Sequence, residues 1–332
     1  MNQLELIARL KPETAKIDAA MRQDLASIDS PRLKEVLEYA IFNGGKRIRP
    51  LLLILAARLC APQADDGPGS GLYRLALAYE YIHAASLLHD DVIDHAESRR
   101  GRATANRVWD NTHVILAGDF LHSRAMWLAG SLGGVDCLAA LSRATAGMVE
   151  AEFLQLANAE EMSRSRERYF AALTGKTGLL IAAACESGAI FAGAGDELRR
   201  ALAVFGNNLG LTFQIVDDLL DYLGDEGKTG KAVGNDFKEG KMTLPLLLAL
   251  ETATAPDRAR LLNWLAAGSA EERRLALPEA REIIDRAGGF TTARRQAEAL
   301  TKDALDALAP FAGRPELSTL KALTAYVLKR EK

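Results

Sequence analysis

Cysteine and proline are both scarce in this chain of 332 residues. Its three cysteines, Cys60, Cys137 and Cys185, lie far apart in apolar segments, without the spacing of zinc ligands. An odd number of separated cysteines argues against a disulfide framework and predicts buried free thiols in a reducing compartment. Only 10 prolines interrupt a sequence in which alanine and leucine dominate. This composition favours an all-α fold.

The chain also has little net charge and no recognisable export or membrane signal. A formal net charge of −3 implies no general affinity for nucleic acid. The N-terminal segment mixes charges from Glu5 onward and contains no apolar core of a signal peptide. No apolar run reaches the ~20 residues that span a bilayer. We therefore expect a cytoplasmic protein without a transmembrane segment and without a nucleic-acid partner.

The composition is uniform along the chain, and no linker divides it. Hydrophobic residues make up 48%, enough for a large core, and no segment shows the alternation of a β-hairpin. We expect a single domain over residues 1–332, a helical bundle around a central cavity. The predicted helices cover 2–28, 31–43, 51–60, 72–94, 113–130, 135–158, 164–174 and 197–222, and they resume from 242 with a polar break near 267–271.

Three aspartates, Asp90, Asp91 and Asp94, form the first of two acidic motifs. At 3.6 residues per turn, Asp90 and Asp94 stand one above the other with Asp91 beside them. At ~5 Å and an effective dielectric of ~20, each carboxylate pair costs about 3 kcal/mol unless a cation neutralises it. Arg99 and Arg100 follow, and their forked donors suit phosphate. Together these residues indicate a site for Mg²⁺ and phosphate.

The same acidic spacing recurs in a second apolar segment, at Asp217, Asp218 and Asp221. The lysines that follow it are Lys228, Lys231 and Lys241. One such motif is weak evidence, because surface helices often carry acidic runs. Two copies, each on an apolar helix and each followed by basic residues, predict two facing helices. Metal ions would lie between the motifs, and a diphosphate would bridge the ions.

Other basic residues follow glycine turns. In the segment GGKRIRP, residues 44–50, Lys46, Arg47 and Arg49 lie where an apolar helix begins, close to amide donors that favour anions. A basic helix start that is merely exposed to solvent would have the same sequence pattern. Because two predicted metal-binding motifs occur elsewhere in the chain, we favour phosphate binding by these residues. Lys176 lies between two apolar helices and is either a surface lysine or part of a cavity wall. Residues 224–241, rich in glycine and lysine, predict a loop that could close over phosphates.

Seven motifs together resemble those of the trans-type polyprenyl diphosphate synthases, over nearly the whole length of the chain. They occur in the family's order at residues 44–50, 83–101, 118–121, 152–156, 175–178, 213–221 and 230–247. The sequence around the first acidic motif is most similar to that of the long-chain branch of the family. This branch makes octaprenyl to decaprenyl diphosphates for quinone side chains. The resemblance implies the all-α isoprenoid synthase fold and a homodimer. It also implies Mg²⁺-dependent, head-to-tail condensation of isopentenyl diphosphate with an allylic diphosphate.

The resemblance assigns a role to each matching residue. Three Mg²⁺ ions would be bound, two by Asp90, Asp91 and Asp94, and the third by Asp217, Asp218 and Asp221. The allylic diphosphate would be held by Arg99, Lys176, Lys231 and Lys241. The diphosphate of isopentenyl diphosphate would be held by Lys46, Arg49, His83 and Arg100, while Thr177 and Gln214 would line the reaction centre. The candidate catalytic residues are Asp90, Asp91, Asp94, Lys176, Asp217, Asp218 and Lys231.

The chemistry agrees with these residue types. When an allylic diphosphate ionises, Mg²⁺ and fixed cations stabilise the leaving group most as the bond breaks. The carbocation then needs apolar walls that exclude water, and the alanine- and leucine-rich helices can supply them. No side chain stands out as the base that removes the final proton, so the released diphosphate is the candidate.

The residues before the first motif are expected to line the pocket for the growing tail. They are Ile82, Ala85 and Ser86. A helical turn rises ~5.4 Å, comparable to one isoprene unit. By resemblance, short-chain enzymes have aromatic residues here, so Ala85 and Ser86 predict an open pocket and a long product. The alternative is that Tyr79, Met126 or Trp127 closes the pocket deeper down, giving a farnesyl or geranylgeranyl product.

Three rival functions remain. His89-Asp90 is a dipeptide typical of some metal phosphohydrolases, and His83 and His95 lie nearby, but Mg²⁺ prefers oxygen ligands and the second acidic motif stays unexplained. A non-catalytic subunit of a heteromeric synthase would be expected to have lost some acidic or basic motif residues. A terpene cyclase would lack the set supplied by Lys46, Arg49, His83 and Arg100. Product release could also involve peripheral contact with a membrane.

Overall fold

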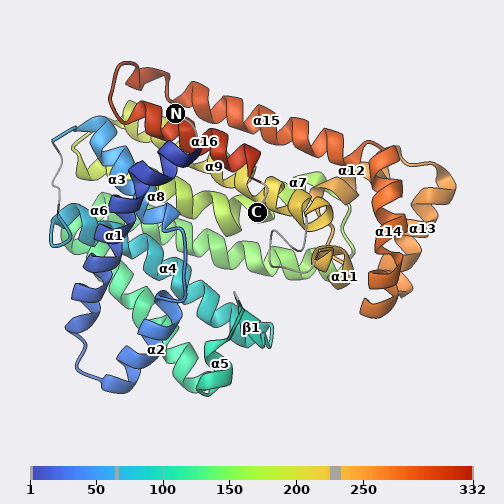
Figure 1. Cartoon of the computed structure of the whole chain (residues 1–332), viewed down its shortest axis with the longest axis horizontal. Helices are drawn as coiled ribbons and strands as arrows, with labels where there is room; N and C mark the ends of the chain where they lie inside the picture. The colour runs from blue at the N-terminus through green and yellow to red at the C-terminus, as the bar shows by residue number, and fades with distance from the viewer. Residues whose placement is uncertain (1–2, 64–66, 100, 225–232, 331–332) are drawn as a thin grey trace. The chain divides into compact units, whose positions relative to one another are not determined.

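The computed structural model describes residues 3–63, 67–99, 101–224 and 233–330. Helices dominate this part of the chain (Figure 1), and the all-α prediction is confirmed. Among the described residues, the strands are β1 (Ser98–Arg99) and β2 (Arg102–Ala103), which pair antiparallel. The expectation that the chain contains no β-hairpin was therefore wrong at this point. Gly101, at a φ of 75°, supplies the backbone conformation that such a tight turn needs.

The described chain separates into two compact units. Unit 1 consists of Met1–Thr145, Leu180–Ala203 and Pro310–Leu320, and unit 2 of Ala146–Leu179, Val204–Ala309 and Lys321–Lys332. The long helices α6 (Asn111–Glu160) and α9 (Asp196–Leu223) contribute residues to both units. The single domain expected from the sequence stays a prediction.

In unit 1, α4 (Gly71–Ile93) is a core helix that carries the first acidic motif at its end. Helices α1 (Gln3–Ala26) and α3 (Ile48–Cys60) pack against it (Figure 1). Residues 51–57 of α3 are all buried, as expected for a helix that is apolar on every side. The remaining helices here include α2 (Pro31–Ile41), α5 (Ala105–Val108) and nearly all of α8 (Leu179–Phe191).

Local sequence signals explain several helix boundaries. The predicted cap before α2 is present, since the Ser30 hydroxyl accepts a hydrogen bond from the Leu33 amide and Pro31 occupies the first turn. Likewise, Ser70 caps α4. The predicted helices 113–130 and 135–158 form the single element α6, with a non-helical residue, Gly134, at a φ of 71°. The break thus lies where it was expected, but the helix resumes at once.

Helix α6 is the one described helix long and apolar enough, by length and composition, to cross a membrane. Core helices of soluble proteins pass the same test, and 33% of its most apolar window is buried. It also presents exposed large apolar side chains, namely Ile115, Leu116, Trp127, Val135, Val149, Phe153 and Leu156. The three cysteines are free thiols, as predicted, with Cys60 partly and the other two fully buried.

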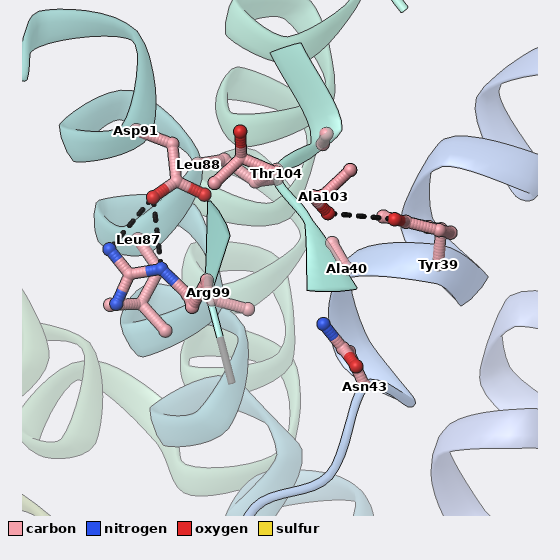
Figure 2. Close-up of a pocket in the computed structure, with 11 residues that line it drawn as sticks. Tyr39, Ala40, Asn43, Leu87, Leu88, Asp91, Arg99, Ala103 and Thr104 are labelled. Atoms are coloured by element: carbon pink, nitrogen blue, oxygen red, sulfur yellow. Dashed lines mark hydrogen bonds and ion pairs between the residues drawn. The ribbon is translucent and has the colours of Figure 1, made fainter. Parts of the chain in front are cut away.

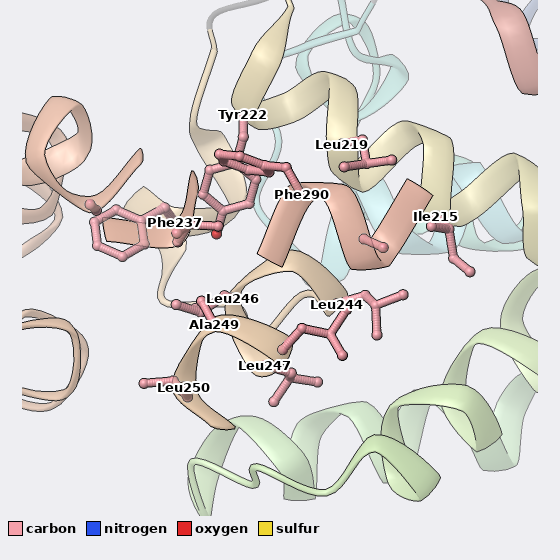
Figure 3. Packing of buried hydrophobic residues seen from close by; sticks show 14 of the residues in the cluster. Ile215, Leu219, Tyr222, Phe237, Leu244, Leu246, Leu247, Ala249, Leu250 and Phe290 are labelled. Carbon is pink, nitrogen blue, oxygen red and sulfur yellow. The ribbon is translucent and has the colours of Figure 1, made fainter. Parts of the chain in front are cut away.

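Unit 2 is built around an apolar cluster between α9 and the C-terminal helices. Figure 3 shows Ile215, Leu219 and Tyr222 of α9 gathered with the leucines of α12 (Leu244–Thr252) and with Phe290. The rings of Tyr222 and Phe290 lie 5.7 Å apart. This packing fixes the last turns of α9, which carry the second acidic motif. The other elements are α7 (Arg166–Leu173), the π-helix η1 (Thr174–Gly178), α11 (Asn235–Glu239), α13 (Ala255–Ala267), α14 (Ala270–Arg286), α15 (Gly289–Ala307), η2 (Ala309–Phe311) and α16 (Leu317–Lys329).

Candidate functional site

The first acidic motif occupies the last turn of α4 in unit 1. Asp91 is buried, Asp90 is partly exposed and Asp94 is exposed. Asp94 lies just beyond the helix, and its amide donates to the Asp90 carbonyl oxygen at 2.8 Å. The three side chains therefore share one end of a helix that is otherwise apolar and buried.

The β1–β2 hairpin brings Arg99 to this motif. The Nε and Nη2 atoms of Arg99 lie 2.9 and 2.8 Å from Oδ1 of Asp91 (Figure 2). The Tyr39 hydroxyl donates to the carbonyl oxygen of Ala103 at 2.7 Å and ties the hairpin to α2. A cavity of about 40 Å³ lies between α2, α4 and the hairpin, and Asp91 and Arg99 form part of its wall. Arg100 lies outside the described residues.

The GGKRIRP segment forms the turn before α3. Gly44 and Gly45 have φ values of 79° and 140°, and Arg47, at 50°, is also left-handed. Lys46 is exposed and Arg49 is partly exposed, but Arg47 is buried. Its guanidinium bonds to carboxylates of other helices and is not directed to solvent. The basic residues of this segment thus divide into two kinds, which the sequence alone does not distinguish.

The residues predicted to line the tail pocket lie on α4 before the motif. Ile82 and Ala85 are buried, at 4% and 5% exposure, and Ser86 is partly buried. Of the residues proposed to close the pocket deeper down, Tyr79 is fully buried and lies at hydrogen-bond distance from Ser187. Trp127 is 50% exposed beneath Arg124, so it is poorly placed to close a buried pocket.

In unit 2, the middle aspartate of the second motif is a buried carboxylate with neutral donors. Asp218 is 4% exposed. It accepts hydrogen bonds from the Tyr169 hydroxyl at 2.6 Å and from Nε2 of Gln214 at 3.2 Å. Burial raises the pKa of Asp218 to about 7, and the nearby charges of Asp236 and Asp217 act in the same direction.

The two outer aspartates of the second motif have other partners. Asp221 accepts hydrogen bonds from the amides of Asn235 and Asp236, at 3.2 and 2.9 Å, and so caps the start of α11. Asp217 forms an ion pair with Arg330, which follows α16, and the Arg330 guanidinium lies 3.9 Å from the Phe213 ring. The Asp217 side chain is 44% exposed, so it can meet a ligand.

The GKTG segment is a short π-helix, η1, an element often found at functional sites. A Cβ atom on Gly175 would lie 2.6 Å from the carbonyl oxygen of Gly147, so this close approach requires glycine. Lys176 Nζ donates to Glu152 at 3.1 Å and to Gln155 at 2.9 Å.

Thr177 extends this arrangement toward the second acidic motif. Its hydroxyl lies 3.5 Å from Gln214 Oε1, and Gln214 in turn bonds Asp218. Lys241 pairs with Asp236 at 3.7 Å and with Glu239 at 2.6 Å. The structure thus brings Thr177, Gln214 and Asp218 into one network, while Lys228 and Lys231 lie outside the described residues.

Three residues of this site were missed in the sequence. Tyr169 and Arg330 lie in or next to runs of charged residues. Their partners lie far away in the chain, so no local signal marks them. Asp236 could have been noticed, because it lies within the glycine- and lysine-rich segment after the second motif. Burial, together with the nearby charge of Asp221, raises its pKa to about 6.

The donor set fits a hard divalent cation. Carboxylate oxygens are the ligands Mg²⁺ prefers, and this ion usually takes one or two carboxylates together with waters and substrate phosphates. In the part of the chain that the structure describes, no three His, Cys, Asp or Glu side chains converge as a ready-made metal site.

Known proteins are similar over nearly the whole chain. A family model described as polyprenyl synthetase matches residues 30–283. The octaprenyl diphosphate synthase of Escherichia coli (strain K12) is 36% identical, over 96% of each chain. A short chain isoprenyl diphosphate synthase of Methanothermobacter thermautotrophicus is 35% identical, over 99% of each. The crystal structure of a decaprenyl diphosphate synthase from Rhodobacter capsulatus superposes with a TM-score of 0.88, at 36% identity and 99% coverage of both chains.

Proposed function

Because the chain belongs to the polyprenyl synthetase family, we propose that it condenses isopentenyl diphosphate head to tail with an allylic diphosphate. The expected product is a trans polyprenyl diphosphate of octaprenyl to decaprenyl length, as in a quinone side chain. The observation that carries this proposal is the duplicated acidic motif, each copy joined to a guanidinium and surrounded by further cationic or amide donors. The octaprenyl and decaprenyl synthases among the relatives support the long product.

Mg²⁺ would be held by Asp90, Asp91 and Asp94 and by Asp217, Asp218 and Asp221, with three ions expected from the family resemblance. When bound, it would neutralise charge on the diphosphate leaving group. Arg99 and Lys176 have partners that fix their positions, and they would receive the allylic diphosphate from there. Lys231 and Lys241 would complete this set, and Lys46, Arg49, His83 and Arg100 would hold the second diphosphate.

The chain's apolar residues would protect the allylic cation. Ile82 and Ala85 are buried on α4 below the first motif, so water is excluded where the tail would lie. Thr177 and Gln214, which are linked to Asp218 by hydrogen bonds, would line the reaction centre. The leaving diphosphate, held by the basic residues, is the proposed acceptor of the final proton.

A cytoplasmic homodimer is the proposed setting. The exposed apolar side chains of α6 supply a surface that a second copy could cover, because large exposed apolar patches mark protein or membrane contacts. Contact of the same surface with a membrane would serve the release of a long product. Light scattering of the purified protein distinguishes a dimer, which we expect, from a monomer.

The test is an incubation of purified protein with isopentenyl diphosphate, farnesyl diphosphate and Mg²⁺, followed by sizing of the dephosphorylated products. We expect elongation to octaprenyl length or beyond, and its loss when EDTA removes the metal. Products limited to farnesyl or geranylgeranyl length would replace the long-chain proposal with the short-chain one. A protein that elongates no primer would be better explained as a subunit of a heteromeric synthase.

A further inference from the structure

Arg47 has a backbone conformation that arginine seldom adopts. Its φ of 50° and ψ of 37° place it in the left-handed region, immediately before α3. For an L-residue with a side chain this conformation is strained. Glycine would occupy the position without that strain, and the two preceding glycines at Gly44 and Gly45 show that the turn uses glycine elsewhere. The side chain of Arg47 must therefore supply something that offsets the strain.

The guanidinium of Arg47 joins three helices of unit 1. Its Nε atom donates to Asp18 of α1 at 2.9 Å, and its Nη1 atom to Glu80 of α4 at 2.9 Å. Its Nη2 atom donates to the carbonyl oxygen of Ile41, at the end of α2, at 2.8 Å. The residue is only 6% exposed. A desolvated ion pair is by itself weak evidence for stability, but its directed hydrogen bonds fix geometry.

The neighbours of Arg47 are the residues expected to hold one diphosphate. Lys46 precedes it, and Arg49 follows it by two positions. In the described structure, the Nε atom of Arg49 is buried without a hydrogen-bond partner, so this guanidinium has unused donor capacity. Glu80, the carboxylate bonded to Arg47, lies three residues before His83 on α4, and these two side chains therefore share a helix face.

We propose that Arg47 is a positioning residue for the binding of isopentenyl diphosphate. It anchors the strained turn to α1, α2 and α4, so that Lys46 and Arg49 stay beside the α4 face that carries His83. This inference rests on the proposed function, which supplies the substrate. Arg47 does not touch the diphosphate itself, because it is buried and each of its three nitrogen atoms is already engaged.

Arg47→Lys is the variant that tests this role. Lysine keeps the charge but cannot make the three directed hydrogen bonds of the guanidinium to Asp18, Glu80 and Ile41. The turn would therefore lose its fixed position. We expect the KM for isopentenyl diphosphate to rise about tenfold, while kcat and the KM for farnesyl diphosphate change less than about twofold. Asp18→Asn removes the most exposed of the three partners and should give a smaller rise of the same kind in a fully folded protein.

Arg124→Lys is the matched control. Arg124 also joins helices of unit 1 through a forked contact, with its Nε and Nη2 atoms 3.1 and 2.6 Å from Asp24. It lies away from the GGKRIRP turn, so its loss should lower the Tm without changing the KM for isopentenyl diphosphate. A purely structural Arg47 would behave in the same way as Arg124, and this result would overturn the proposal.

Calorimetric binding of isopentenyl diphosphate, without an allylic primer, separates this inference from the proposed function. If the wild type binds and elongates but Arg47→Lys binds equally well, the positioning role is wrong and the function stands. If the wild type does not elongate, the proposed function fails, and weaker binding by Arg47→Lys would still support the positioning role. An equal rise in both KM values would indicate general disruption and would overturn the inference.

Discussion

The acidic motifs of α4 and α9 have the same spacing but different neighbours. In α4, two of the three aspartates are open to solvent to some degree, and the buried one, Asp91, faces the guanidinium of Arg99. In α9, the buried aspartate, Asp218, receives only neutral donors in its hydrogen bonds, from Tyr169 and Gln214. Spacing decides which side chains share a ridge, and the packing around the ridge decides which partners each of them meets.

This difference bears on how the second motif binds metal. Asp218 has a pKa raised to about 7, so at neutral pH it must lose a proton before it can bind a cation. The second motif is therefore expected to bind metal more weakly as the pH falls below about 7.

The largest expected effect comes from removing one accessible carboxylate from each motif. Asp90→Asn and Asp217→Asn should each lower kcat by about 10²–10³-fold or more, because each weakens the charge stabilisation of the leaving group. Asp196→Asn, at an exposed position on α9, should leave the rate unchanged. Turnover measured at saturating substrates and Mg²⁺ provides the comparison. Equal losses would mean that the motifs act as one site, and a loss under tenfold at either would contradict its catalytic role.

The next effect is on stability as a function of pH. The pKa of Asp218 is about 7 in the folded state, against an ordinary 3.8, so the folded protein binds more protons than the unfolded chain between these values. The stability from this proton is complete below pH ~4 and is lost as the pH rises through ~7. Asp236, with a pKa raised to about 6, adds a loss of the same sign. We therefore expect the metal-free protein to become less stable between pH 5 and 8.

Asp218→Asn should flatten most of this dependence and raise stability at pH 8 by on the order of 1–3 kcal/mol, since a neutral amide replaces a buried charge. Urea unfolding of the metal-free variant and wild type at several pH values measures the difference. No comparable change is expected for Asp94→Asn in the first motif, whose side chain is exposed. A wild-type stability that rises from pH 5 to 8 would show that Asp218 is already ionised.

The sequence could predict the two helices that carry the acidic motifs, but it could not predict which residues surround them. Apolar periodicity predicted α4 and α9 to within a residue or two at each end, because each helix has a continuous local signal. The β1–β2 hairpin was not predicted, because each strand has only two residues. The hairpin is supported by a hydrogen bond from Tyr39, which lies far away in the sequence.

The same limit applies to the partners of the motif aspartates. Asp221 was predicted as a metal ligand, yet its two oxygens accept the amides that begin α11. Asp217 meets Arg330 from the far end of the chain. Spacing within a helix fixes the motif itself, whereas contacts between distant segments depend on the complete fold.

Arg330 occupies one carboxylate of the second acidic motif. Its guanidinium holds Asp217 in the structure, so it competes with a metal for that carboxylate. We expect Arg330→Gln to lower the Mg²⁺ concentration for half-maximal activity about three- to tenfold, in line with the loss of one charge-assisted hydrogen bond. Lys329→Gln, at the adjacent exposed position, is the control. A higher Mg²⁺ requirement would instead show that Arg330 helps to hold the metal-bound diphosphate.

Substitution of the residue one helical turn before an acidic motif should change the rate least, but it should clearly change the length of the product. This residue is Ser86 in α4 and Phe213 in α9. Ser86→Phe places in α4 the aromatic ring that α9 already has, at a partly buried position before the aspartates. We expect shorter products with kcat changed less than about tenfold, because the ring blocks the tail and leaves the charged groups in place. Ala85→Phe should act in the same direction.

Sizing of the dephosphorylated products tests this, with Ser131→Phe, at an exposed position on α6, as the control for an added phenyl group. If Ser86→Phe and Ala85→Phe both leave the product length unchanged, the tail does not pass this turn of α4, and Ile82, Ala85 and Ser86 do not line its pocket. If the products shorten, the two motifs differ in function as well as in surroundings: the open turn before the first accommodates the tail, while the aromatic before the second supports Arg330.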